Sequence, residues 1–192
     1  ILVPGLIEWP ARIRQPLASR VRASTSDLLP TVCALVGQAP PDRPLDGIDL
    51  TAALDGKLDE RPSPLYFWSY STRRLERSKP QPWINPELQQ GTTPLVKLMN
   101  GKPTRDFKNY RQPPITEDDY LGPRAIIDGR FKLVLHEQPK GAKRELFDLA
   151  ADPAEKVNLF EQQPAIAERL QTELRDWQQS VLSSLAGQDY PH

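Results

Sequence analysis

The pattern of apolar and polar positions predicts a strand, a helix and a second strand in the first third of the chain. Residues 1–10 are rich in Ile, Leu and Val and carry prolines, which is typical of a buried strand. A helix is expected to begin near Ser26 or Asp27, whose side chains can accept bonds from unpaired backbone N–H groups, and to end at Gly37. Residues 65–68, Leu-Tyr-Phe-Trp, are predicted to form the second strand. The apolar face of the helix would consist of Leu28, Leu29, Val32, Leu35 and Val36.

The second half of the chain has the pattern of antiparallel strands followed by a covering helix. Residues 124–136 contain two strand-like runs joined by Asp128-Gly129, a dipeptide that favours the positive φ angles of a tight hairpin. A further strand is expected at residues 145–149. The last predicted element is a long amphipathic helix that begins at Pro164. Its apolar stripe consists of Ile166, Leu170, Leu174, Trp177, Val181 and Leu185.

Two segments depart from this regular pattern. Residues 72–119 contain seven prolines and few periodic apolar positions. Within them, residues 72–111 carry nine basic and three acidic side chains, a local net charge of +6. Residues 152–155, Asp-Pro-Ala-Glu, are expected to begin a short helix, with Asp152 as its cap and Glu155 at capping-box spacing.

Composition narrows the class of protein. The 192 residues include 25 Lys or Arg and 25 Asp or Glu, so the net charge is zero and a globally basic nucleic-acid binder is excluded. A single cysteine excludes an internal disulfide and a Cys-cluster metal site. No apolar run approaches the roughly 18 residues that a membrane span needs. The chain starts at Ile1 inside an apolar stretch, which favours the C-terminal part of a longer protein.

Few side chains offer catalytic chemistry. His136 ends a predicted strand with no Gly-x-Ser-x-Gly elbow or paired cysteine, so a structural or surface role is favoured, and His192 is the last residue. Cys33 lies on the side of the first helix predicted to face inward and is expected to be a buried, inert thiol. Asp118-Asp119 is expected to be a solvated acidic turn rather than a metal site. No nucleotide-binding glycine motif is present.

The basic segment is the most distinctive chemical feature of the sequence. Its basic side chains alternate with Trp83, Phe107 and Tyr110. Arginine forks bind the oxygens of sulfate, phosphate and carboxylate groups, and aromatic rings stack on sugars. Composition alone leaves two interpretations open, the rim of an anionic-glycan site and a solvated surface loop, and it favours the loop.

Taken together, five ordered motifs resemble the sulfatases of the alkaline phosphatase superfamily. Residues 2–10 are similar to the R-V-P-hydrophobic-x-W-P strand of that family, with Leu2 where arginine is usual. Residues 24–31 are similar to S-x-x-D-[IL]-x-P-T, and residues 44–50 to the D-G-x-[SD]-L turn. Residues 124–133 are similar to R-[AS]-[IV]-R-x-G-x-[WY]-K-[LY]. The fifth motif, E-L-Y-D-L-x-x-D-P-x-E-x-x-N-L, is matched at residues 145–159.

The resemblance implies an α/β fold in two parts. Residues 1–64 would form the end of a large alkaline-phosphatase-like α/β domain, contributing an edge strand and a helix. Residues 65–192 would form a smaller C-terminal subdomain with a four-stranded antiparallel sheet and a C-terminal helix. The basic, proline-rich residues at about 72–119 would be an insertion in that subdomain.

The resemblance also implies an activity whose centre lies elsewhere. Sulfatases hydrolyse sulfate esters with a formylglycine made from the Cys or Ser of C/S-x-P-S-R, and they use a calcium ion. Those motifs precede the V-P-x-x-x-x-W-P strand, so the resemblance implies no catalytic residue and no metal ligand in this chain, which by itself is expected to be inactive. The implied partner is the N-terminal catalytic portion of the same protein. The implied substrate is a sulfated carbohydrate or an aryl sulfate, and the implied location is the periplasm or the outside of the cell.

Three residues are candidates for substrate binding. Tyr70, Arg73 and Arg74 follow the predicted strand 65–68, in a region similar to the part of sulfatases that helps to form the rim of the substrate pocket. They are chosen by position and chemistry rather than by a matched motif.

Two alternative functions stay open. One is a phosphonate or phosphodiester hydrolase of the same superfamily, and the other is a non-catalytic module that binds anionic glycans.

Overall fold

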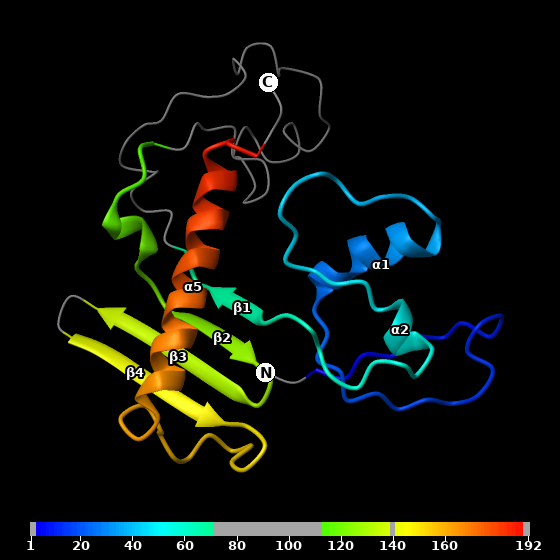
Figure 1. The fold of residues 1–192 in the computed structure, drawn as a ribbon, viewed down its shortest axis with the longest axis horizontal. Helices are drawn as coiled ribbons and strands as arrows, with labels where there is room; N and C mark the ends of the chain where they lie inside the picture. Colours follow the sequence, from blue (N-terminus) through cyan, green and yellow to red (C-terminus); the bar gives the residue numbers. More distant parts are fainter. Residues whose placement is uncertain (1–2, 71–112, 139–140, 190–192) are drawn as a thin grey trace, which may run out of the picture.

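A computed structural model describes residues 3–70, 113–138 and 141–189 of the chain (Figure 1). Two of the substrate-binding candidates, Arg73 and Arg74, lie outside the described residues. The elements are, in chain order, the 3-10 helix η1 (Thr25–Asp27), helices α1 (Leu28–Leu35) and α2 (Thr51–Leu54), strand β1 (Leu65–Trp68), the 3-10 helix η3 (Glu117–Tyr120), strands β2 (Arg124–Asp128), β3 (Phe131–Gln138) and β4 (Gly141–Asp148), and helix α5 (Pro164–Leu185).

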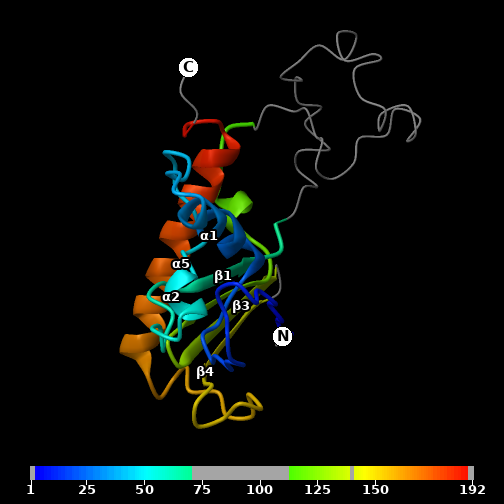
Figure 2. The same ribbon diagram turned by 90° about the vertical axis from the view of Figure 1, so that its right-hand side faces the viewer.

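The four strands form one antiparallel sheet in the order β1-β2-β3-β4. One row of paired residues crosses the whole sheet, because Tyr66 pairs with Ile126, Ile126 with Leu133, and Leu133 with Leu146. The three aliphatic side chains of this row have no exposed surface. They form the core together with Leu170 and other residues of α5, which runs along one face of the sheet (Figure 2). The four-stranded antiparallel sheet and the C-terminal helix are therefore confirmed.

The predicted hairpin and the long helix form where the sequence places them. Asp128 pairs with Phe131 across the β2–β3 turn, and Gly129 has a φ of 51°, the left-handed value that the turn requires. Helix α5 begins at Pro164. Proline has no backbone N–H, but no hydrogen bond is lost here because the N–H groups of the first turn have no partner within the helix. The side chains that α5 buries are Ala167, Leu170, Leu174, Gln178 and Leu182. The predicted apolar stripe is therefore correct only in part, because Leu185 is 45% exposed whereas Gln178 is fully buried.

Helix α1 begins and ends at the expected signals. The hydroxyl of Ser24 and the carboxylate of Asp27 form a capping box around η1, which leads directly into α1. Gly37 follows the last turn and has a φ of 68°. Glycine adopts this left-handed conformation readily because it has no Cβ, so it ends the helix.

A buried ion pair joins η1 to residues far along the chain. Asp27 is fully buried and accepts two bonds from the Arg61 guanidinium, at 2.8 and 2.9 Å. Its carboxylate also accepts the backbone N–H of Ile48 at 2.8 Å. Gly47 makes this approach possible, because a Cβ at that position would lie 2.0 Å from the carbonyl oxygen of Ser26. The 44–50 turn is therefore anchored to η1 by a charged network rather than by apolar packing.

The prediction of a strand at the N-terminus is wrong for the described residues. Residues 3–10 pair with no strand of the described chain, and Leu6 is 95% exposed. A buried strand needs a hydrogen-bonding neighbour and apolar layers on its faces, and the described elements supply neither to this segment. Its hydrophobic sequence alone could not reveal this dependence.

Within the described residues, the apolar face of α1 does not point inward as predicted. Leu28 is 60% exposed and Val36 is 62% exposed, whereas Asp27 and Thr31 are buried. The hydroxyl of Thr31 accepts the backbone N–H of Leu50 at 2.9 Å, so the polar side of the helix faces the 44–50 turn. Hydrogen bonding to that turn thus decides which side of α1 points inward.

The expected short helix at residues 152–155 is a turn instead. Asp152 does act as a cap, because its carboxylate accepts the backbone N–H groups of Lys156 and Val157 at 2.6 and 2.8 Å. Glu155 has a φ of 54°, which ends any right-handed helix there. Its carboxylate lies 2.7 Å from the ammonium of Lys132 on β3, so the side chain is held by the sheet.

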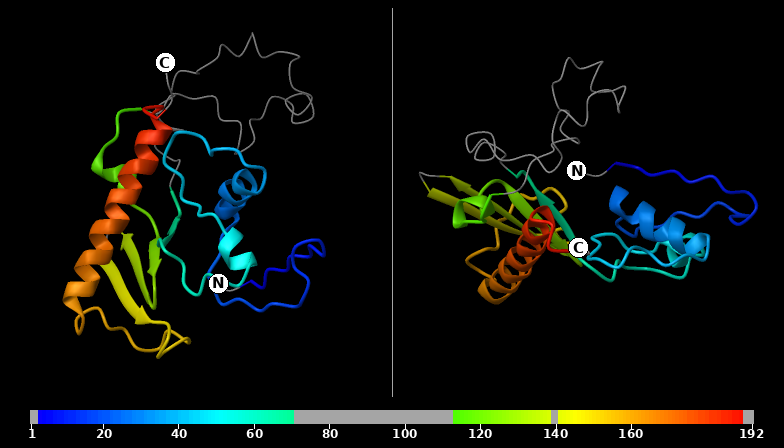
Figure 3. Two further views of the ribbon diagram at one scale, coloured as in Figure 1. Left: turned by 45° about the vertical axis from the view of Figure 1, so that its right-hand side comes forward. Right: turned by 90° about the horizontal axis from the view of Figure 1, so that it is seen from above.

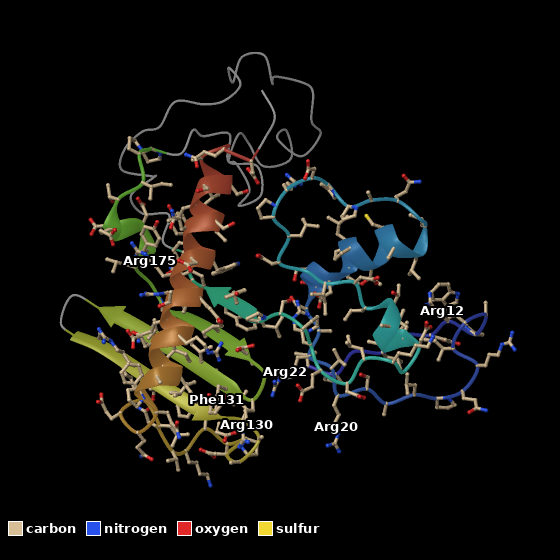
Figure 4. The ribbon with its side chains drawn as sticks, in the orientation of Figure 1. Arg12, Arg20, Arg22, Arg130, Phe131 and Arg175 are labelled. Atoms are coloured by element: carbon tan, nitrogen blue, oxygen red, sulfur yellow. The ribbon has the colours of Figure 1, made fainter. Side chains whose placement is uncertain are left out.

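Replacing Asp27 by asparagine tests the buried network. Asp27→Asn leaves Arg61 buried without its counter-charge, and we expect a loss of about 3 kcal/mol in the free energy of unfolding, measured by urea denaturation. The control is Asp55→Asn, whose partner Arg12 is partly exposed (Figure 4), so that solvent screens the pair and the loss is much smaller. Equal losses in the two variants would contradict the assignment.

The same pair predicts a dependence of stability on pH. Burial alone would raise the pKa of Asp27, but bonds from Arg61 and from two backbone N–H groups hold that pKa below its usual value. Because the folded pKa is the lower one, the stabilisation is complete above the unfolded pKa of about 3.9 and is lost as pH falls through the folded pKa. Stability measured between neutral and acidic pH should therefore fall more steeply for the native chain than for Asp27→Asn.

Candidate functional site

Tyr70 is the one substrate-binding candidate within the described residues, and it follows directly after β1. Its hydroxyl donates to the carboxylate of Asp119 at 3.4 Å. Asp119 is 4% exposed and also accepts the backbone N–H of Thr116 at 2.8 Å. The backbone at Gly122 lies close to Ser69, the residue before Tyr70. A side chain would not fit there, since a Cβ would lie 2.5 Å from the carbonyl oxygen of Ser69. Tyr70 is thus held against η3 at the end of the edge strand.

Tyr70 ends a row of four aromatic side chains. Tyr66 stacks on Trp177 with ring centroids 4.9 Å apart and planes 5° apart. Trp68 meets Trp177 edge to face at 6.2 Å, and it meets Tyr70 in the same manner at 5.0 Å. Three of the rings come from alternate positions of β1 and its extension, so they share one side of the strand. The aromatic row runs from α5 to the point where the chain enters the basic segment.

A groove lies at the α5 end of the aromatic row. Its volume is about 380 Å³, and it is formed by the 44–46 and 63–64 loops together with β1 and α5. The indole N–H of Trp177 donates to the Asp46 carboxylate at 2.7 Å, which ties α5 to the 44–50 turn beside the groove. The lining residues are Pro44, Leu45, Asp46, Ser63, Pro64, Tyr66, Glu173, Asp176, Trp177 and Ser180.

The electrostatics of the groove oppose an anionic ligand. Asp46, Glu173 and Asp176 line it, and its described lining includes no Lys or Arg. Burial raises the pKa of the Tyr66 hydroxyl, and the carboxylates of Glu173, Asp128, Asp46 and Asp176 raise it further. Glu173 is paired with Arg169 at 2.9 Å, so a sulfate group in the groove would meet the negative charges of Asp46 and Asp176 without a cation in the described lining. The groove is therefore unsuited to sulfate, despite its aromatic wall.

One described arginine, Arg175, lies on helix α5, and the two arginines expected at the site lie outside the described residues. Arg175 on α5 donates to both carboxylate oxygens of Glu117 at 2.8 Å, and its guanidinium carbon lies 3.2 Å from the centroid of the Tyr120 ring (Figure 4). This arginine is already engaged within the fold. Arg73 and Arg74 are outside the described residues, so the structure does not place them relative to Tyr70.

The remaining candidates have structural surroundings. His136 is half-buried on β3, opposite Lys143. Cys33 is half-buried on α1 rather than fully buried as expected, because the side of the helix predicted to face the core does not. Asp118 is exposed, but Asp119 is not the solvated residue predicted, since it caps η3 and accepts the Tyr70 hydroxyl. Among the described residues, no three His, Cys, Asp or Glu side chains gather as a metal site.

Sequence reasoning missed the aromatic row. Tyr66, Trp68 and Tyr70 are two residues apart in the sequence, a visible signal that they share one face of a strand. Trp177 was placed on the apolar stripe of the last helix, but its stacking partner lies more than a hundred positions away. Only the pairing of β1 at the edge of the sheet brings the four rings together.

Comparisons with known proteins give one consistent result, although no family model matches the chain. Bovine arylsulfatase A is 31% identical over 164 residues, which cover 85% of this chain and 27% of that protein. Rat arylsulfatase G is 43% identical over 56 residues, or 29% of this chain and 11% of that protein. A solved structure from Bacteroides fragilis, described as a sulfatase, matches with a TM-score of 0.56 and 16% identity over 95% of this chain and 30% of its own.

The comparisons agree with the fold described here. The chain spans about a quarter of the length of arylsulfatase A and less than a third of the solved structure. The likeness to the solved structure extends over nearly all of this chain, so it includes both the part before β1 and the sheet with α5. The mixed α/β fold, with its antiparallel sheet and C-terminal helix, is thus shared.

The tie between Trp177 and Asp46 can be measured directly. Trp177→Phe keeps a ring that can stack on Tyr66 but removes the donor of the 2.7 Å hydrogen bond. A double-mutant cycle with Asp46→Ala should give a coupling energy of about 1 kcal/mol in the free energy of unfolding. As a control, the cycle of Trp177→Phe with Asp42→Ala should give no coupling. A coupling near zero for Asp46 as well would contradict the bond.

Proposed function

Because the chain corresponds to the C-terminal portion of a sulfatase of the alkaline phosphatase superfamily, we propose that it is part of an enzyme that hydrolyses sulfate esters. In this proposal the catalytic centre is formed by another portion of the fold, and this chain completes the fold and contributes one wall of the substrate cleft. The chain alone is then inactive. The observation that supports the proposal best is the 31% identity with bovine arylsulfatase A over 85% of the chain.

The formylglycine and the calcium ion of sulfatases belong, in this proposal, to the portion outside the chain. The described residues do not fit a calcium site, since no three carboxylate, imidazole or thiol groups gather among them. Asp27 and Asp119 are buried, but both carboxylates already have partners. Asp27 accepts hydrogen bonds from Arg61, and Asp119 accepts the backbone N–H of Thr116 in the η3 cap. No catalytic step is therefore assigned to a metal held by these residues.

The proposed substrate is a sulfated carbohydrate or an aryl sulfate. Tyr70, Arg73 and Arg74 would lie at the rim of the cleft, where guanidinium forks can pair with sulfate oxygens and an aromatic ring can contact a sugar or aryl group. The acidic groove beside Trp177 supports this assignment indirectly, because its carboxylates would repel the sulfate, whereas the sequence of residues 72–111 carries a net charge of +6. The alternative of a non-catalytic module that binds anionic glycans would use the basic segment, of which residues 72–112 lie outside the described residues, so the groove does not test it.

Two further proposals rest on the resemblance. Residues 1–64 are the end of the large α/β domain and residues 65–192 the C-terminal subdomain, a division that falls where β1 begins at Leu65. The protein acts in the periplasm or outside the cell. No helix in the described part is both long and apolar enough to cross a membrane.

Alanine substitution in the full-length protein tests the proposed rim. Arg73→Ala and Arg74→Ala should each raise KM for an aryl sulfate by about tenfold, the loss expected for one charged hydrogen bond to an anion. The matched control is Arg20→Ala, an exposed arginine on the N-terminal segment (Figure 4), which should leave KM unchanged. If both rim variants hydrolyse the sulfate like the native protein, these arginines do not bind substrate.

The ring and the hydroxyl of Tyr70 can be separated in the same assay. Tyr70→Phe removes the hydroxyl that bonds to Asp119 and keeps the ring, whereas Tyr70→Ala removes both. We expect the alanine variant alone to raise KM, because the proposed contact is made by the ring.

Assays with matched aryl sulfate and aryl phosphonate esters would decide the reaction class, and faster turnover of the phosphonate would select the alternative hydrolase.

A further inference from the structure

Helix α1 has its polar side inward and its apolar side outward. Its inner side is fixed by the buried Asp27 and Thr31, which bind the 44–50 turn through their side-chain oxygens. The outward side chains are large, aliphatic and roughly half exposed, and residues 28–36 include no charged residue. These outward residues, the α1 outer face, are Leu28, Leu29, Val32 and Val36. A helix on the surface of a protein normally has the opposite arrangement, with its apolar side inward and its polar side toward solvent.

The α1 outer face therefore has the character of a covered surface. Contiguous exposed apolar side chains are uncommon on soluble proteins, and they mark interaction sites. Helix α1 lies on the side of the molecule away from α5 and the sheet (Figures 1 and 3), so the core of the subdomain does not cover it. Val3 and Leu6 in the same part of the chain are also exposed, at 78% and 95%.

The comparisons indicate what covers this face. The solved sulfatase structure matches 95% of this chain, but the match makes up only 30% of that structure. In a complete fold of this kind, the segment that contains α1 is accompanied by a portion more than twice as large. We propose that the α1 outer face docks on an uncharged, apolar surface of that remaining α/β portion. This inference rests on the proposed function, and it names the surface through which the chain completes the catalytic fold.

The test compares one substitution in two forms of the protein. Val32→Glu places a charge in the middle of the α1 outer face. In the 192-residue chain Val32 is 52% exposed, so the melting temperature should shift by less than about 1 °C. In the full-length protein the glutamate would be buried against an apolar surface, and the melting temperature should fall by at least about 5 °C. Val157→Glu is the matched control, because Val157 is also 52% exposed but lies in the loop after β4.

Cys33 supplies a second readout without any substitution. It is the only cysteine of the chain and is half-buried on α1. Alkylation at Cys33, followed by peptide mass spectrometry, should be at least about tenfold slower in the full-length protein than in the 192-residue chain if docking covers the helix. Equal alkylation rates, together with equal effects of Val32→Glu in both forms, would overturn the proposal.

Other outcomes also decide the question. If the 192-residue chain forms a dimer that Val32→Glu dissociates and Val157→Glu does not, the face pairs with a second copy and the proposal is wrong. If the gene encodes no further α/β portion, the proposal is likewise wrong. If the α1 effects appear as expected but the full-length protein hydrolyses no sulfate ester, then the docking surface stands and the proposed function fails.

Discussion

The buried pair of Asp27 and Arg61 sets the direction in which the N-terminal part of the chain can pack. A fully buried carboxylate is stable only with a counter-charge and filled hydrogen-bonding positions, and Arg61 and the backbone N–H of Ile48 supply them. Both partners lie on the same side of α1. Once that side is committed to polar contacts, the leucines and valines of the helix have only the opposite direction left, and the exposed α1 outer face is the consequence.

The same 44–50 turn connects this polar network to the antiparallel sheet. On one side of the turn, Ile48 binds Asp27, and on the other, Asp46 accepts the indole N–H of Trp177. Trp177 in turn stacks on Tyr66 at the edge strand. A short segment around Gly47, where a side chain would collide with Ser26, thus joins η1 to α5. This accounts physically for an Asp-Gly pair at this position of the chain.

Local patterns predicted the parts of the fold that local interactions decide. The Asp128-Gly129 hairpin and the α5 helix follow from turn chemistry and from a regular apolar stripe, and both form as expected. The errors concern features that depend on distant partners. The direction of α1 depends on Arg61, which is 34 positions from Asp27, and the burial of Asp119 is accompanied by a contact with Tyr70, which is 49 positions away. Residues 3–10 look like a strand, but no periodicity can supply the neighbour that a strand must pair with.

Charge distribution gives the two ends of the aromatic row different roles. At the α5 end, Asp46, Asp176 and the Arg169-paired Glu173 line the groove beside the stacked Tyr66 and Trp177, so the free energy of an anion rises as it approaches. At the other end, Tyr70 leads into a segment whose net charge is +6, which attracts anions. The rings themselves are neutral and rigid, and their packing holds the edge strand against α5. An anionic ligand that approaches the stacked Tyr66 and Trp177 is therefore directed away from the groove.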